Sequence, residues 1–406
     1  MNAPTTDWTA ASTAELPDVI ALRRAIHADP EIGLHCPRTT AKLRAALEGL
    51  PLEIHESSST TGFVAILRGG AGGAGDNGRT VLLRGDMDAL PMAEETGLDF
   101  ASGVPGAMHA CGHDAHSAML VGAARALCAR AESLPGTVVF MFQPGEEGHH
   151  GARFMIEDGL LAHAKPDAAF ALHISPNMPA GQVVSRAGPL LASADTLHAV
   201  IRGKGGHAAM PHECIDPVPV ACEIVGALQT YIARRVPVTD PAVLSITKID
   251  AGSAHNIVPD RVELLGTLRA LSEKTRTDAA AAFKRIVAGI AAAHGCEGEA
   301  WIDDGYPVTR NDPAAVALIA STADALGGEG TYVTMPAPMM GAEDFSYVLR
   351  ETPGAMAFLG VAAPGTDPAT NPPLHNTRMT IDESVMARGV ALHCALAERF
   401  LDGGLG

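Results

Sequence analysis

The sequence predicts an α/β protein with a mixed, largely parallel sheet flanked by helices, into which a smaller α+β domain of split βαβ topology is inserted. Three observations predict this architecture. Apolar runs separated by helical patterns indicate a sheet covered on both faces. A middle segment has alternating strands in the order β-α-β-β-α-β. The 406 residues also exceed what one hydrophobic core normally holds. We therefore expect a main domain at 1–188 and 305–406 and an inserted domain at 189–304.

The elements of the first half follow from hydrophobic periodicity. Two apolar runs flank GGAGGAGDNG, which we interpret as an exposed hairpin loop. The predicted helices are 16–29, 38–49 and 117–132, and the predicted strands are 62–69, 79–86, 136–144 and 167–175.

The middle of the chain alternates differently. Ser272 and Gly295 are suitable caps for the longest predicted helix, 272–295. The inserted domain is predicted to contain strands 196–203, 242–252, 261–271 and 297–304 and helices 215–236 and 272–295. Beyond residue 305 we expect helices 312–326 and 343–351 and strands at TYVTM and GAMAFLG, which complete the main domain.

Composition excludes several classes of function. The net charge of −17 argues against binding to nucleic acid and to anionic membranes. The N-terminus lacks the pattern of a signal peptide, and no apolar run is long enough to span a membrane. The seven cysteines are scattered without a CxxC pair, so we expect free thiols and a cytoplasmic protein.

Chemistry-bearing residues follow three of the predicted strands. Asp86 and Asp88 follow one, Glu146 and Glu147 another, and His173 ends a third. MHACGHDAHSAM places Cys111 and His113 just before a helix. A lone histidine or glutamate pair is commonly structural. Three such groups at strand ends, together with a loop before a helix that would reach the same sheet edge, instead predict a metal site, because ligands bind at this edge in open α/β sheets.

Other chemistries lack their motifs. No GxSxG follows a strand, and neither a GxxxxGK[ST] loop nor a suitable GxGxxG is present. Carboxylates, imidazoles and one thiol remain, a mixture that suits Zn, Mn, Ni or Co better than Ca or Mg. Glu146 and Glu147 are adjacent in an extended segment, so one can hold metal while the other faces a water molecule. The spacing does not say which.

An ordered set of motifs resembles the amidohydrolase branch of the aminoacylase/carboxypeptidase metallopeptidase superfamily, which includes hippurate, N-acyl-amino-acid and indole-acetyl-amino-acid hydrolases. The set spans roughly residues 15–400 and consists of LLRGDMDALP, MHACGHDAHSAM, FQPGEEG, ALHISP, GKGGHAAMPH, AGSAHNIVPD, GAEDFSYV and LHNTRM. The resemblance implies that Glu146 is the general base and that Asp88 orients a ligand. It implies five metal ligands, with Cys111 bridging two ions and Asp86 outside the set: Cys111, His113, Glu147, His173 and His375.

The inserted domain resembles the family's lid, which carries the dimer interface. The resemblance implies that His207 reaches the reaction centre from the neighbouring subunit and stabilises the oxyanion. It also implies that Asn256 and Arg269 hold a substrate carboxylate, for which a guanidinium fork is well suited. From the pattern alone, His207 could be a surface histidine and Arg269 a strand residue facing water.

These implications predict a metal-dependent hydrolase that cleaves N-acyl amino acids, such as hippurate-like or acetyl-amino-acid substrates, into a carboxylic acid and an amino acid. We expect two divalent ions per subunit, with manganese or zinc ahead of nickel and cobalt, and a homodimer formed through the lid. A dipeptidase or carboxypeptidase on the same metal centre is the alternative, and a non-catalytic binding protein is a third.

A few residues near the motifs have weaker interpretations. His116 is interpreted as structural or as a support for a ligand, and His109 has no assigned role. His149 and His150 are expected to face solvent. Met339 and Met340 are interpreted as core residues, with the wall of an acyl pocket as the alternative.

Overall fold

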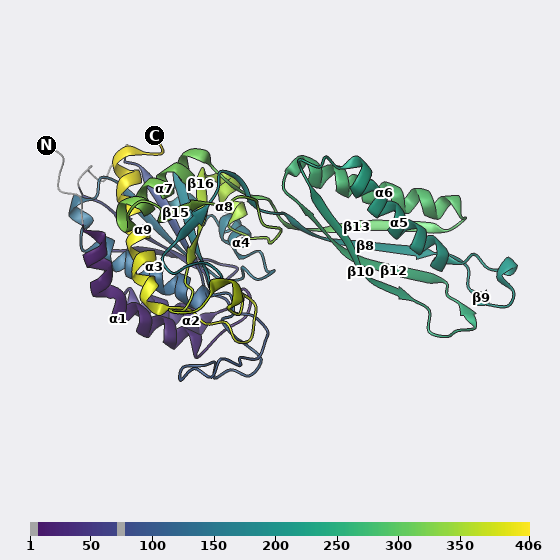
Figure 1. Cartoon of the computed structure of the whole chain (residues 1–406), viewed down its shortest axis with the longest axis horizontal. Helices are drawn as coiled ribbons and strands as arrows, with labels where there is room; N and C mark the ends of the chain where they lie inside the picture. Colours follow the sequence, from purple (N-terminus) through teal and green to yellow (C-terminus); the bar gives the residue numbers. More distant parts are fainter. Residues whose placement is uncertain (1–6, 71–77) are drawn as a thin grey trace. The chain divides into compact units, whose positions relative to one another are not determined.

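The computed structural model describes residues 7–70 and 78–406, which form two compact units. The first unit comprises residues 1–188, 310–337 and 347–406, and the second comprises 189–309 and 338–346. Each unit has its own sheet with its own helices (Figure 1). The predicted α/β class is confirmed.

The first unit is built on an eight-stranded mixed sheet. Its central strand β3 (Thr80–Asp86) is buried at every residue and lies between β4 and β5, both parallel to it. The strands in order across the sheet are β1 (Glu53–Glu56), β2 (Phe63–Arg68), β4 (Thr137–Gln143), β3, β5 (Ala168–Ser175), β16 (Gly354–Gly360), β6 (Val183–Ser185) and β15 (Tyr332–Thr334).

The predicted hairpin between 62–69 and 79–86 is wrong. Strand β2 pairs with β1 and β4, and β4 separates it from β3. The reason is burial, because β3 and β4 are apolar on both faces and need a neighbour along each edge. Most of the GGAGGAGDNG loop, residues 71–77, lies outside the described residues.

Three helices pack against one another over one face of this sheet: α1 (Trp8–His27), α3 (His113–Cys128) and α9 (Met386–Gly403). Helix α3 is buried along nearly its whole length, which its many alanines permit. The remaining helices with residues in this unit are α2 (Pro37–Ala46), α4 (Gly151–Glu157), α7 (Pro313–Gly327) and α8 (Ser346–Glu351). The sequence did not predict α9 or α4.

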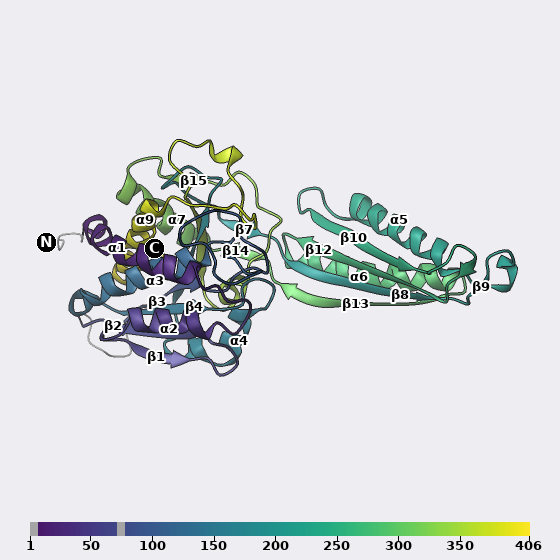
Figure 2. The same ribbon diagram turned by 90° about the horizontal axis from the view of Figure 1, so that it is seen from below.

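The second unit has the predicted order β-α-β-β-α-β around a four-stranded antiparallel sheet. The strands across it are β10 (Ala242–Ala251), β12 (Arg261–Ala270), β8 (Ala194–Arg202) and β13 (Glu297–Tyr306). Helices α5 (Pro217–Arg235) and α6 (Glu273–Ala293) pack side by side on one face of the sheet (Figure 2). Ser272 caps α6 as predicted, with its hydroxyl accepting from Thr275 N, and Gly295 follows the C-cap with φ of +73°.

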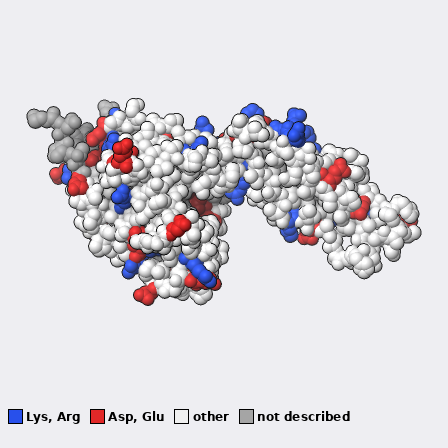
Figure 3. Space-filling model, viewed as in Figure 1, with Lys and Arg blue, Asp and Glu red and all other residues white. Residues whose placement is uncertain are grey.

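Short strands complete the described chain. Strands β9 (Gly206–His207) and β11 (Ile257–Val258) pair with each other, and β7 (Gly188–Leu191) and β14 (Thr309–Asn311) lie near the boundaries of the second unit in the sequence. Among the described helices, none is both long and apolar enough to cross a membrane. Acidic and basic side chains are interspersed on the face of the molecule seen in Figure 3.

Candidate metal centre

Three neighbouring parallel strands bring the chemistry-bearing segments to one edge of the first unit's sheet. Asp86 is the last residue of β3, Glu146 and Glu147 follow β4, and His173 lies near the end of β5. Because β3 lies between β4 and β5, their carboxyl ends meet at the same edge. His375 arrives on a loop, with its backbone N–H donating to Ala110 O at 2.8 Å.

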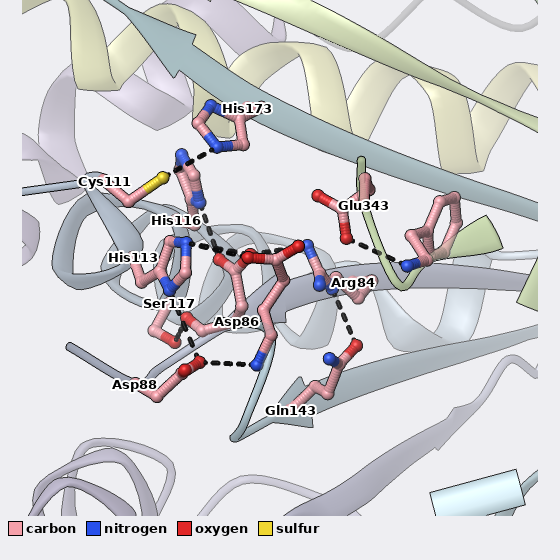
Figure 4. A network of polar contacts seen from close by, with 12 residues as sticks. Arg84, Asp86, Asp88, Cys111, His113, His116, Ser117, Gln143, His173 and Glu343 are labelled. Atoms are coloured by element: carbon pink, nitrogen blue, oxygen red, sulfur yellow. Dashed lines mark hydrogen bonds and ion pairs between the residues drawn. The ribbon is translucent and has the colours of Figure 1, made fainter. Parts of the chain in front are cut away.

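The start of α3 supplies two more candidate ligands. Cys111 precedes the helix and His113 is its first residue, with Gly112 as the N-cap between them. Gly112 has φ of +85°, and a Cβ there would lie 2.2 Å from Ile174 Cδ1. Glycine suits this tight turn, from which Cys111 points towards His173 and His113 points towards the carboxylates of Asp86 and Asp88 (Figure 4).

The structure brings the five predicted ligands together. The ligand atoms of Cys111, His113 and His173 lie within 4.8 Å of one another, as do those of Cys111, Glu147 and His375. Cys111 belongs to both groups, with its Sγ 3.4 Å from His173 Nε2. His375 is the most open of the five, with 54% of its side chain exposed and Nε2 3.2 Å from Glu147 Oε1.

The donor atoms fit a metal ion. His173 Nδ1 donates to Ile174 O at 2.7 Å, which leaves the lone pair of Nε2 facing Cys111. Within the described residues, the ring nitrogens of His113 and Oε1 of Glu147 are buried and make no well-aligned hydrogen bond, although ionisable groups of Asp86, Asp88 and His375 lie 3.2–3.5 Å away. Buried polar atoms are rarely left so, and a metal ion would satisfy them. The mixture of sulfur, nitrogen and oxygen donors suits a borderline divalent ion.

Burial and neighbouring charges set the protonation of this cluster. Burial raises the pKa of the Cys111 thiol well above its ordinary value. A metal ion that binds Cys111 must therefore displace the proton of its thiol. Burial lowers the pKa of His173 well below its usual value, and the neighbouring His116 adds to this, so His173 stays neutral as a ligand must.

Asp88 supports the candidate ligands from behind. Its two carboxylate oxygens accept the backbone N–H of Glu146 at 2.9 Å and of Glu147 at 3.1 Å. Oδ1 also lies 3.4 Å from His113 Nδ1. The side chain is buried, so these contacts are shielded from water. Asp88 thus ties the glutamate pair to the first residue of α3.

Asp86 is the centre of a second support. His116 Nε2 accepts from Ile174 N at 2.9 Å, which leaves Nδ1 to donate to Asp86 Oδ1 at 2.6 Å. Arg84 donates to Asp86 Oδ2 at 2.6 Å. Burial alone would raise the pKa of Asp86, but Arg84, His113 and His116 hold it well below its usual range. Asp86 Oδ2 lies 3.5 Å from His113 Nε2, close to the predicted ligand set.

Sequence reasoning missed part of this network. Arg84 also donates to Gln143 Oε1 at 2.9 Å, and neither residue was singled out. The signal was an arginine inside the otherwise apolar run RTVLLRGD, because a fully buried arginine requires partners.

The three remaining predicted site residues lie in the second unit. His207 is in β9, and Ala208 N donates to the backbone oxygen of Asn256 at 3.1 Å, so His207 and Asn256 are neighbours. Arg269 lies near the other end of β12, where Nε donates to Thr267 Oγ1 at 3.3 Å.

Arg269 is far from the other two within this unit. Strand β12 begins at Arg261, opposite Arg202, on the side where β9 and β11 follow. At a rise of about 3.4 Å per residue, Arg261 and Arg269 are about 27 Å apart. Asn256 and Arg269 of one copy of this unit therefore cannot hold the same carboxylate.

Two expectations for nearby side chains are wrong. His150 is half-buried, with Nδ1 3.0 Å from Tyr347 Oη, because its left-handed conformation at the start of α4 turns the ring inwards. Met339 is 43% exposed and is not a core residue. His109, to which no role was assigned, is buried, and burial lowers its pKa to about 3.

The sequence is similar to those of known proteins. The model of peptidase family M20/M25/M40 matches residues 82–399. Thermostable carboxypeptidase 1 of Saccharolobus solfataricus is 37% identical, covering 94% of this chain and 95% of that protein. N-acetylcysteine deacetylase of Bacillus subtilis is 36% identical, covering 91% of this chain and 93% of that protein.

A solved structure shares the fold. The YXEP protein of Bacillus subtilis, described as a dinuclear metal binding peptidase from the M20 family, superposes with a TM-score of 0.82 at 33% sequence identity. The alignment covers 96% of this chain and 99% of that one.

Proposed function

Because the chain belongs to peptidase family M20/M25/M40, as its ordered motifs indicated, we propose that it hydrolyses the amide bond of N-acyl amino acids at a centre of two divalent metal ions. The observation that carries the proposal is the position of Cys111. It belongs to two ligand groups, one with His113 and His173 and one with Glu147 and His375. A thiolate shared in this way can bridge two ions.

The five residues of these groups would hold the ions, with manganese or zinc as the first candidates and nickel and cobalt as alternatives. Bound divalent ions in such a centre polarise a carbonyl oxygen and make water a usable nucleophile near neutral pH. The YXEP protein, described as dinuclear, supports two ions rather than one.

The chain's own residues would carry the proton and hold the substrate. Glu146 takes the proton from the attacking water and gives it to the leaving amine. Asp88 fixes the segment that presents Glu146, through its bond to the backbone N–H. His207 donates a hydrogen bond to the carbonyl oxygen of the scissile amide. Asn256 and Arg269 grip the free carboxylate and so select acyl amino acids over simple amides.

This division of labour requires a second copy of the chain. The roughly 27 Å along β12 prevents Asn256 and Arg269 of one copy from gripping one carboxylate. We therefore propose a homodimer in which His207 and Asn256 of one subunit complete the site of the other. The predicted segments 1–188 and 305–406 would be catalytic, and 189–304 would be the lid and dimerisation domain.

A reducing compartment suits this centre. All seven cysteines of the described chain are free, and a ligand thiol must not be oxidised. We propose the cytoplasm as the location, and oxidation of the isolated protein should abolish metal binding.

The experiment that tests the activity is a substrate panel on the metal-loaded protein. Hippurate, acetyl-amino acids, indole-acetyl-amino acids, dipeptides and carboxypeptidase substrates are compared, with the metal content measured. Hydrolysis of acyl amino acids that is lost on chelation and in Glu146→Gln, while that variant keeps its metal, supports the proposal. Preference for peptides would favour the carboxypeptidase alternative, which the similarity to the archaeal carboxypeptidase raises. Binding without turnover would favour a non-catalytic protein.

The dimer is tested by mixing two inactive variants, Glu146→Gln and His207→Ala. In a random mixture, about half of the dimers are mixed and each has one intact site, so about one quarter of the wild-type activity should return. Mixtures that stay inactive although the subunits exchange would contradict a site shared between subunits.

A further inference from the structure

We infer that His27 is a positioning residue for the metal centre, because its contact with Asp114 holds the start of α3 and thereby the segment that carries Cys111 and His113. The inference rests on the metal centre proposed above. His27 itself is not a candidate ligand and lies on α1, a different helix.

The contact is short and fully buried. Asp114 is the second residue of α3, directly after His113. Its Oδ2 is 2.7 Å from His27 Nδ1 and accepts from Arg23 Nε at 2.9 Å. Neither the His27 nor the Asp114 side chain is exposed at all. Arg23 and His27 are one helical turn apart, so one face of α1 presents both groups to Asp114.

His27 is held from its other side as well. Its Nε2 lies 3.1 Å from Glu94 Oε1, and Glu94 Oε2 accepts from Ser102 N at 2.7 Å. The imidazole therefore lies between two carboxylates, each fixed by further contacts. Arg23 is similarly tied to Glu383, with Nη1 at 2.8 Å from its Oε1. The position of Asp114 is thus set by α1 and its surroundings rather than by α3 alone.

The start of α3 has no capping side chain at its N-cap. Its N-cap is Gly112, which has no side chain to accept the free N–H groups of the first turn. Asp114 is the only acidic residue in that turn, and Arg23 and His27 both engage its Oδ2. Loss of His27 would leave this buried carboxylate with half of its charged contacts, and the first turn could then shift. Residues that support metal ligands typically contribute about 10- to 100-fold to metal affinity.

The test uses two amide variants that divide the contacts of His27. In His27→Asn the side-chain NH2 can take the place of Nδ1 and still donate to Asp114. In His27→Gln the NH2 reaches instead towards the position of Nε2, beside Glu94. Affinities for Mn²⁺ and Zn²⁺ are measured on the full-length apoprotein by competition with a chelator, at a temperature where every variant is folded. We expect His27→Gln to weaken binding at least tenfold and His27→Asn to stay within about threefold of wild type.

A control separates positioning from general loss of stability. Val19 is buried in α1 without polar contacts, so Val19→Ala should lower the melting temperature and leave metal affinity unchanged. The inference is overturned if His27→Gln binds metal as wild type does, if both amide variants weaken it equally, or if Val19→Ala weakens it as much. Failure of the wild type itself to bind either ion would overturn the proposed metal centre, and only with it this inference.

Discussion

Replacement of Asp88 by asparagine should weaken metal binding and turnover together. The asparagine would keep the size of the side chain but have only one oxygen, whereas Asp88 uses one oxygen for Glu146 N and the other for Glu147 N. One charge-assisted hydrogen bond is lost, which costs about 1.5–3 kcal/mol. If the whole cost falls on the metal-bound state, it corresponds to a rise in Kd of about 10- to 150-fold.

The assay is calorimetric titration of the apoprotein with Mn²⁺ or Zn²⁺, followed by kcat at saturating metal. Asp158→Asn is a control away from the centre, since Asp158 accepts two consecutive backbone N–H groups on one oxygen, from Ser58 at 2.9 Å and Ser59 at 3.0 Å, and contacts none of the candidate ligands. It should leave metal affinity unchanged. A metal Kd for Asp88→Asn within threefold of wild type would refute the supporting role of Asp88.

Two further predictions concern stability. Gly112→Ala should lower the melting temperature and weaken metal binding, because a Cβ would lie 2.2 Å from Ile174 Cδ1. Gly97 has a similar φ but open space around it, so Gly97→Ala should show only the smaller backbone cost. Equal losses of metal affinity in the two variants would contradict this prediction. Burial alone would raise the pKa of Glu383, but hydrogen bonds and charges from Arg24 and Arg23 hold this pKa below 4.5. The contribution of Glu383 to stability is therefore complete above that pH and is lost as the pH falls through the folded-state pKa. Glu383→Gln should therefore destabilise the protein at pH 7 and reduce the fall in melting temperature between pH 6 and about pH 3; an unchanged acid transition would count against this assignment.

The polar residues at the strand ends could be predicted from the sequence, because each follows directly after an apolar run. A buried parallel strand is mostly apolar, so Asp86 and Glu146 stand out where the apolar runs end. The strands of the inserted unit could also be predicted, since apolar and polar residues alternate along half-exposed strands such as β8 and β12. Helix α6 could be predicted from its long amphipathic pattern and its capping serine, Ser272.

The order of the strands was not readable in this way. Nothing in the run FVAILRG distinguishes pairing with β3 from pairing with β4, and the short link predicted a hairpin that the structure does not contain. Helix α4 is too short to show a clear hydrophobic period, and the left-handed conformation of His150 before it has no signature in the sequence.

The kind of chemistry can be predicted from the residue types and the order of the motifs, because these limit which ions and reactions the chain can support. How those residues are held depends on the folded structure. Asp88, Asp86 and Asp114 look alike in the sequence, yet each contacts partners brought from elsewhere in the chain, Glu146, His116 and His27 respectively. The longest of these three contacts, between His27 and Asp114, joins residues 87 positions apart. Such contacts depend on which elements become neighbours, and a linear pattern does not contain that information.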